Sequence, residues 1–446
     1  MKKRLVCFGM FIVLLFSLSG CAAKDMNSKA EILIEDGAVG LDSDMEFSIS
    51  DKAAGTEEST GLDSSGAPDM PESKVSESIG DLQGGSQDNI PAKPGLLTAG
   101  EWNDNHNWGF LTNLYNSQNT TYPSFGINPM KRIAVHVTDG DAPVMDARVE
   151  LKDTEGNILW ESISDYNGYA YVFYDVCEKE GLPAFIEAKK KEARTEQPVV
   201  PSEAVEDKQQ DAVSADGQDN TAVRFPEEIT LELSDTETEP ALDIMFVFDT
   251  TGSMTDELVY LQEEFKDIAA NVSDDKTRFS VNFYRDEGDD YVVKSNEFMD
   301  DINEVSSLLN AEAADGGGDY PEAVDQALND GVYNHQWREG STKLLFLILD
   351  APPHDTAETA SVLSQAVRTA SAQGIRIIPI ASSGIDKETE FFLRACAVLT
   401  GGTYTFLTDH SGIGGSHLEP TIGSYDVEPL NSCIIRLINQ YYPSSR

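Results

Sequence analysis

The sequence is poor in positive charge and in cysteine. Its 446 residues contain 32 Lys and Arg against 78 Asp and Glu, which gives a formal net charge of −46 at pH 7. Binding to phosphate backbones needs clustered cations, so this balance argues against nucleic acid and anionic membrane surfaces as partners. The 5 cysteines form neither a disulfide framework nor a zinc spacing. The sequence also lacks a Gly-x-Ser-x-Gly elbow and an HExxH motif, which argues against two common classes of hydrolase.

Residues 1–21 have the features of an export signal. Three basic residues precede an apolar run, Leu5–Leu18, that is too short to cross a membrane comfortably. Leu18-Ser19-Gly20-Cys21 resembles a bacterial lipobox, which implies cleavage before Cys21 and acylation of that residue. We therefore expect a bacterial lipoprotein held at the cell membrane, facing outside the cytoplasm, through its lipid alone. An ordinary secretory signal is the alternative.

The next two segments differ in their aromatic content. Residues 22–95 are rich in Ser, Gly, Asp and Glu with few aromatics, so we predict a disordered acidic tether with a reach of roughly 45–50 Å. Residues 96–130 contain Trp102, Trp108 and Phe110 and are too apolar for a linker. We expect this aromatic transition segment to pack on the domain that follows it.

Residues 131–236 alternate apolar and polar side chains as half-buried strands do. Asn167-Gly168 predicts a hairpin between Ile158–Ser164 and Tyr169–Val176. The segment Pro143–Val149 together with Asp165–Gly168 resembles the small carboxypeptidase-regulatory-type β-sandwiches of bacterial surface proteins, which implies that fold here. A Pro-, Gln- and acid-rich run at 192–224 predicts a disordered insertion.

The stretch Leu242–Met254 predicts a binding site. An apolar run ends abruptly at Asp249, and Thr251 and Ser253 follow before a helical pattern begins. In open α/β sheets, ligands bind outside the carboxyl ends of the strands, where helices begin. One carboxylate and two hydroxyls are hard oxygen donors of the kind that Mg²⁺ prefers, so we predict a metal site.

Two more oxygen-rich pieces follow at separations of roughly 70 and 100 residues. The first is Gly316–Glu322, with Asp319, which precedes a helix. The second is Asp350-Ala351-Pro352-Pro353 at the end of the apolar strand Leu344–Leu349. Strand and helix patterns alternate throughout residues 241–443, which predicts an α/β doubly wound, Rossmann-like sheet covered on both faces.

Asp249-Thr250-Thr251-Gly252-Ser253 resembles the DxSxS signature of the von Willebrand factor type A family, and the two later pieces lie where that family has them. The resemblance implies a metal-ion-dependent adhesion site formed by Asp249, Thr251, Ser253, Asp319 and Asp350. It also implies a divalent cation, Mg²⁺ with Ca²⁺ or Mn²⁺ as alternatives, that accepts a carboxylate from a protein or cell-surface ligand. Asp319 departs from the family, which usually has Thr there, and adds a negative charge beside the metal.

Two other functions stay open at this point. The Asp loop also resembles that of haloacid-dehalogenase-type phosphotransferases, but Lys343 lies at the wrong end of its strand for that chemistry, and prolines follow Asp350. We therefore do not expect an enzyme. A scaffold that uses its metal for stability alone is the other alternative. The expected whole is multi-domain, with a disordered tether, a β-sandwich and an α/β domain.

Overall fold

The computed structural model describes residues 92–117, 125–176, 181–201, 224–234 and 241–442. The chain divides into two compact units, residues 1–90 and 91–446, and the description that follows concerns the second. The predicted signal segment, Cys21 and almost all of the predicted tether lie outside the described residues. Within them, no helix has both the length and the apolar character needed to cross a membrane.

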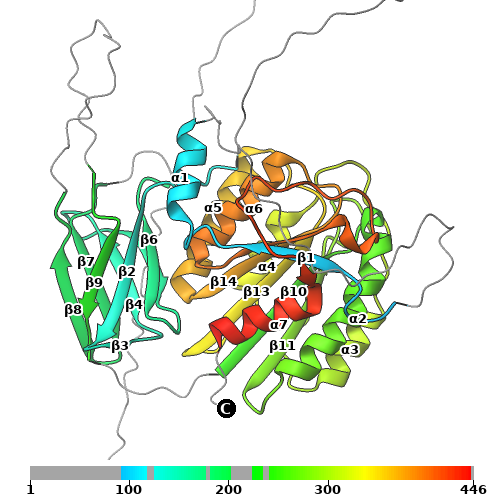
Figure 1. The fold of residues 1–446 in the computed structure, drawn as a ribbon, viewed down its shortest axis with the longest axis horizontal. Helices are drawn as coiled ribbons and strands as arrows, with labels where there is room; N and C mark the ends of the chain where they lie inside the picture. Colours follow the sequence, from blue (N-terminus) through cyan, green and yellow to red (C-terminus); the bar gives the residue numbers. More distant parts are fainter. Residues whose placement is uncertain (1–91, 118–124, 177–180, 202–223, 235–240, 443–446) are drawn as a thin grey trace, which may run out of the picture. The chain divides into compact units, whose positions relative to one another are not determined.

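Eight strands of the described residues form the main sheet (Figure 1). Its centre is parallel and consists of β11 (Thr277–Tyr284), β10 (Ala241–Asp249), β13 (Ser341–Leu349), β14 (Ile375–Ala381) and β15 (Tyr404–Leu407). Short antiparallel strands complete both edges: β12 (Val293–Lys294) next to β11, and β1 (Thr98–Trp102) followed by β16 (Glu428–Pro429) next to β15. The prediction of a largely parallel sheet is confirmed.

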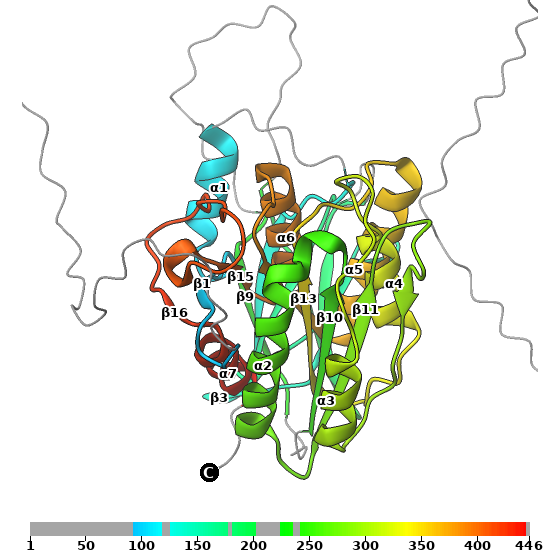
Figure 2. The same cartoon turned by 90° about the vertical axis from the view of Figure 1, so that its right-hand side faces the viewer.

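Helices cover both faces of this sheet because its buried residues alternate between them (Figure 2). Phe246 and Phe346 pack on the side of α2 (Thr255–Val272), α3 (Ile302–Asn310) and α7 (Leu430–Tyr441). Val247 and Leu347, one residue further along each strand, pack on the side of α4 (Val324–Tyr333), α5 (Ala357–Gln373) and α6 (Lys387–Thr400). This arrangement agrees with the doubly wound prediction.

Residues 132–232 form two further sheets of four strands each among the described residues. One contains β3 (Ala142–Pro143), β2 (Arg132–Asp139), β6 (Tyr169–Phe173) and β9 (Glu228–Glu232). The other contains β5 (Ile158–Ile163), β4 (Arg148–Lys152), β7 (Phe185–Lys190) and β8 (Ala193–Pro198). Buried residues of both sheets, such as Val135 and Val149, belong to one cluster, which continues into the side of the main sheet that α4, α5 and α6 cover.

Two predictions about this region need correction. Asn167-Gly168 does form a tight turn, in which Gly168 N–H donates to Asp165 O at 2.9 Å, but β5 and β6 belong to different sheets. The turn therefore carries the chain from one sheet to the other. The predicted insertion at 192–224 is wrong at its start, because Ala193–Pro198 is strand β8 and pairs with β7. Its polar sequence hid an edge strand that backbone hydrogen bonds hold, and residues 202–223 lie outside the described part.

Residues 96–130 contact both the α/β domain and the domain that follows them directly. Strand β1 pairs with β15 in the main sheet, and α1 (Trp108–Ser117) follows it. Asp104 accepts two hydrogen bonds of 2.8 Å from the buried guanidinium of Arg394 on α6. Tyr115 of α1 also packs edge-to-face on Phe391 of α6. The segment also packs on the domain that follows it, because Arg132 of β2 donates to Asn105 O at 2.8 Å and to Asn105 Oδ1 at 2.9 Å, and its guanidinium lies 4.1 Å from the centre of the Trp108 ring. The predicted packing is therefore found, and the place of β1 in the main sheet is an addition to it.

Candidate metal centre

The first loop of the site begins where β10 ends. The side chain of Asp249 is fully buried, and its Oδ1 accepts hydrogen bonds from the backbone N–H of Thr251 at 2.9 Å and from the Thr251 hydroxyl at 2.7 Å. Its Oδ2 accepts from the hydroxyl of Tyr284 at 3.2 Å. The hydroxyls of Thr251 and Ser253 lie 3.2 Å apart. Three of the five predicted ligands are therefore brought together by one turn.

The glycine-rich loop packs against this turn. Gly252 N–H donates to Gly316 O at 3.2 Å, and Asp315 N–H donates to Thr250 O at 3.0 Å. Gly317 has a φ of +70°, and a Cβ there would lie 3.1 Å from Glu322 Oε1 and 3.2 Å from Thr251 Cβ. Only glycine fits this conformation and this approach without strain. The loop therefore holds the Glu322 carboxylate close to the first loop.

Asp319 and Glu322 differ in where the structure places them. Asp319 is exposed, whereas Glu322 is 3% exposed. Glu322 N–H donates to Pro352 O at 2.9 Å, which ties the start of α4 to the loop after Asp350. Glu322 is therefore the acidic residue of this loop that is buried beside the site. The role of Asp319 as a metal ligand stays a prediction.

Asp350 supplies the third part of the site. It follows β13 and is 5% exposed, and the Ser253 side chain favours its ionised form, which links the first and third loops. Its Oδ1 is buried without a hydrogen-bond partner, and so are Glu322 Oε2 and Glu257 Oε2. Glu257 lies in the first turn of α2, is 1% exposed, and adds its negative charge near Asp350. Glu257 has a positive partner in His417, whose Nε2 lies 3.4 Å from Glu257 Oε1. A buried carboxylate oxygen without a donor is costly, so the free oxygen of Asp350 favours a cation beside it.

The charges of this cluster repel one another. Burial, followed by the charge of Asp350, raises the pKa of Asp249. Burial also raises the pKa of Asp350 and, together with the charges of Asp249, Asp286 and Asp350, raises the pKa of Glu322 to about 9. Asp104 is neutralised by the buried guanidinium of Arg394. In the described residues, no buried Lys or Arg makes such a contact with Asp249, Asp350 or Glu322. A divalent cation would supply the missing positive charge.

The oxygen atoms of this site fit a cation that is bound by hydroxyls as well as by carboxylates. Among the described residues, no three His, Cys, Asp or Glu side chains form a group that could hold a metal by themselves. The set at hand is two carboxylates, Asp249 and Asp350, with the hydroxyls of Thr251 and Ser253. Such hard oxygen donors suit Mg²⁺ or Mn²⁺, which keep water on the remaining positions.

Sequence reasoning missed Glu322 and Glu257. The signal for Glu322 was its place just before α4, in the same glycine-rich loop as Asp319, but the sequence could not tell which of the two side chains turns inward. Glu257 lies one turn after Ser253 on the helix that starts at the site, so i, i+4 spacing brings both to one face. Periodicity alone did not separate it from the exposed acidic residues of α2.

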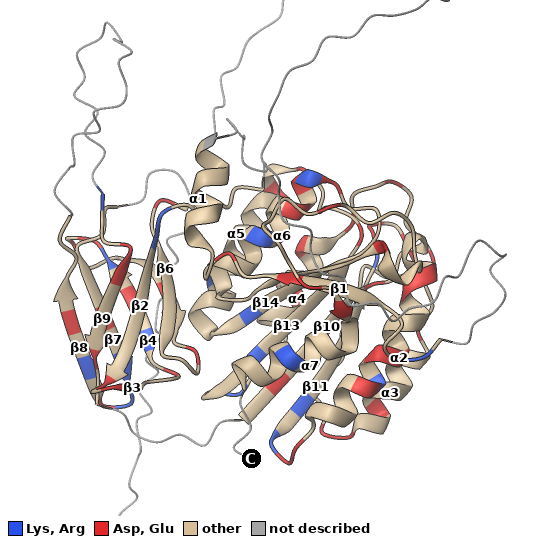
Figure 3. Cartoon of the chain, in the orientation of Figure 1, with Lys and Arg blue, Asp and Glu red and all other residues tan. Residues whose placement is uncertain are grey.

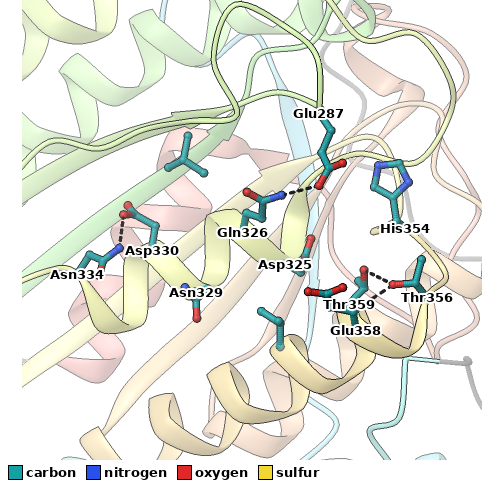
Figure 4. Close-up of a pocket in the computed structure, with 12 residues that line it drawn as sticks. Glu287, Asp325, Gln326, Asn329, Asp330, Asn334, His354, Thr356, Glu358 and Thr359 are labelled. Atoms are coloured by element: carbon teal, nitrogen blue, oxygen red, sulfur yellow. Dashed lines mark hydrogen bonds between the residues drawn. The ribbon is translucent and has the colours of Figure 1, made fainter. Parts of the chain in front are cut away.

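Acidic residues are widespread over the ribbon, and basic ones are few (Figure 3). A cavity of about 740 Å³ lies between α4 and the start of α5. Four of its lining residues are acidic, Glu287, Asp325, Asp330 and Glu358 (Figure 4). Its one basic lining residue is His354, which is hydrogen-bonded to Asp286 at 2.7 Å. The cavity shares its bordering segments with the site, because α4 follows Glu322 and His354 follows Asp350.

Comparison with known families agrees with this geometry. A model of the von Willebrand factor A domain matches residues 243–411, which contain all three loops. Residues 243–411 form a von Willebrand factor A domain. This domain shares its sheet with β1 and β16, which lie outside the matched range.

Individual proteins resemble the chain more weakly. A putative ariadne-like RING finger protein of Acanthamoeba polyphaga mimivirus is 25% identical over 190 residues, which cover 38% of this chain and 18% of that protein's length. A conserved hypothetical protein, BatB, from Bacteroides thetaiotaomicron is 13% identical, with 46% of this chain and all of that chain covered and a TM-score of 0.33. Proximal thread matrix protein 1 of the mussel byssus is 17% identical, with 34% and 39% covered and a TM-score of 0.28.

Proposed function

We propose that the von Willebrand factor A domain holds a divalent cation, Mg²⁺ in the first place, and uses it to bind an acidic group of another protein or of a cell surface. Asp249, Thr251, Ser253 and Asp350 would hold the ion directly. The observation that carries the proposal is the buried Asp350 Oδ1, which has no hydrogen-bond donor although it lies in the loop cluster with Ser253. A cation with an open coordination position would satisfy this oxygen and accept a partner's carboxylate.

The surroundings favour a partner with basic groups next to its carboxylate. The cavity beside the site contributes Glu287, Asp325 and Glu358, and the chain as a whole is strongly acidic. A purely acidic partner would be repelled by this surface before it reached the cation, whereas flanking Lys or Arg residues would be attracted. We therefore infer a partner surface that presents one carboxylate within a basic patch.

A phosphotransferase is the less favoured function. The side chain of Asp249 is fully buried, whereas a nucleophilic carboxylate has to meet a phosphoryl group directly. Lys343 lies near the opposite end of β13 from Asp350, at a distance of roughly 23 Å for seven residues of extended strand. Its ammonium donates to Gln373 O at 3.0 Å. We propose a binding protein rather than an enzyme.

We also propose that residues 1–21 direct export and that Cys21 carries the lipid that tethers the domain outside the cytoplasm. Fractionation of expressing bacteria tests this part separately, because Cys21 lies outside the described residues. The Cys21→Ala variant is expected in the medium or the soluble fraction. Unchanged membrane association of that variant would contradict the lipid anchor.

Binding to envelope extracts tests the adhesion site. The wild-type chain is expected to retain a partner in Mg²⁺ and to release it in EDTA, and Asp249→Ala is expected to retain none. Asp319→Asn is the matched control for Glu322→Gln. If Asp319→Asn binds the partner fully and Glu322→Gln does not, Glu322 is the residue of the glycine-rich loop that supports binding. Equal binding with and without EDTA would refute the function. If EDTA changes only the melting temperature, the metal serves stability alone, as in a scaffold.

A further inference from the structure

Tyr320 is a large aromatic side chain at the surface of the candidate metal centre. It belongs to the glycine-rich loop and is 44% exposed. Among the large apolar side chains that are exposed in the described residues, it is the one that lies in the three loops of the site. A single exposed apolar residue is ordinary on a protein surface, so exposure alone marks no function. The argument depends instead on what holds this side chain and on which charges surround it.

The hydroxyl of Tyr320 fixes the side chain across the rim of the site. It donates to Gly384 O at 3.1 Å, in the loop between β14 and α6. This loop borders the third part of the site, because a Cβ on Gly384 would lie 3.5 Å from Asp350 O. Its next residue, Ser383, donates through its N–H to Glu257 Oε1 at 3.1 Å. The ring is therefore held beside the metal ligands before any partner arrives, which reduces the conformational entropy lost on binding.

The surroundings of the ring are negatively charged. Burial, followed by the charges of Asp386 and Asp350, raises the pKa of Tyr320. Asp386 is exposed, and so is Asp319, which precedes Tyr320 in the chain. The face of an aromatic ring attracts cations, and carboxylates around it attract the same charge. An exposed, anchored ring in such a place suits a cationic side chain of a partner.

We propose that the ring of Tyr320 stacks on an Arg or Lys side chain of the protein whose carboxylate binds the metal. This inference rests on the proposed function and adds the residue that selects the partner. The metal would take the carboxylate, and Tyr320 would take a cation next to it. Tyrosine is one of the residues that most often dominate the energetics of protein interfaces.

A purely structural role for Tyr320 is the alternative, and Tyr333 provides the matched control for it. Tyr333 ends α4, which begins just after Glu322, and is 47% exposed. Its hydroxyl is also anchored, at 2.7 Å from that of Thr369. The two tyrosines therefore share exposure and anchoring, but Tyr333 lies at the end of α4 away from the site.

Selection from a peptide library tests the proposal. The library displays peptides in which one fixed aspartate is flanked by randomised positions, and the whole chain is immobilised in Mg²⁺ and eluted with EDTA. Tyr320→Leu keeps an apolar side chain and removes the ring, whereas Tyr320→Phe keeps the ring and removes the hydroxyl. Tyr333→Leu makes the same change at the control position.

We expect the peptides eluted from the wild type, Tyr320→Phe and Tyr333→Leu to be enriched in Arg and Lys, and those eluted from Tyr320→Leu to lose this enrichment. Replacing the selected cation by Gln in the best wild-type peptide should weaken calorimetric binding roughly fivefold for the wild type and leave it unchanged for Tyr320→Leu. General attraction to the acidic surface would act on all four proteins alike, so equal enrichment in Tyr320→Leu would overturn the proposal.

The melting temperature separates the partner contact from the metal site. Mg²⁺ should raise it equally in the wild type and in Tyr320→Leu, because Tyr320 is not a proposed ligand. A smaller Mg²⁺ response in Tyr320→Leu would mean that Tyr320 supports the metal loops, and this would overturn its role in partner recognition. If EDTA elutes no peptide from the wild type, the proposed function itself fails, and the inference about Tyr320 fails with it.

Discussion

Replacing Asp249 by Asn should stabilise the cation-free protein, although Asp249 is fully buried and accepts three hydrogen bonds. An Asn Oδ1 can keep the two bonds from Thr251. The Tyr284 hydroxyl can rotate to accept a bond from the new amide, because a hydroxyl both donates and accepts. The substitution therefore removes a buried charge without removing its polar contacts.

The magnitude follows from the electrostatics of the site. Burial and the charge of Asp350 raise the pKa of Asp249, and each unit of such a shift corresponds to about 1.4 kcal/mol against the charged form. We expect Asp249→Asn to gain roughly 2 kcal/mol at pH 8 in EDTA, or roughly 4 °C in the melting temperature. Mg²⁺ at roughly 100 times its Kd should stabilise the wild type by about 2.7 kcal/mol and leave the variant unchanged.

Asp243 provides a control in the same strand. It is also fully buried, but Arg278 and Arg338 donate hydrogen bonds of 2.8–3.0 Å to its carboxylate. Asp243→Asn should destabilise the chain by roughly 1–3 kcal/mol, because it weakens the charge-assisted hydrogen bonds from Arg278 and Arg338, whose side chains are 20% and 31% exposed. Thermal unfolding of the three proteins with and without Mg²⁺ measures both effects. A lower melting temperature of Asp249→Asn in EDTA, or an equal Mg²⁺ response of Asp249→Asn and the wild type, would refute the reasoning.

Two further predictions concern pH and the transition segment. Burial alone would raise the pKa of Asp243, but its arginine partners lower it overall, so its stabilising contribution is present above the unfolded value of roughly 3.9 and is lost as the pH falls further. Acid titration of the unfolding free energy should accordingly be flatter below pH 4 in Asp243→Asn than in the wild type. Asp104→Asn should lower the free energy of unfolding by roughly 3 kcal/mol, because it leaves the buried Arg394 with a weaker partner. The control is Lys266→Gln, which breaks the partly exposed pair with Glu263 and should change the free energy of unfolding by less than roughly 1 kcal/mol. Denaturant titration measures both changes.

The sequence predicted the central strands and the closeness of Asp249 to Asp350 because both depend on local pattern. The apolar runs that become β10 and β13 are buried on both faces, and each ends in an aspartate. Parallel strands place their carboxyl ends at one edge, so Asp249 and Asp350 had to meet once the sheet was assumed. The charge of Asp350 raises the pKa of Asp249, which agrees with that inference.

The edge strands β1 and β8 and the burial of Glu322 could not be predicted, because they depend on contacts between distant parts of the chain. Strand β1 joins the main sheet through β15, about 300 residues later, and nothing in its local sequence specifies that partner. Strand β8 has a polar sequence and is held by backbone pairing to β7. The inward turn of Glu322 depends on Gly317 and on the contact with Pro352, both of which are visible only in three dimensions.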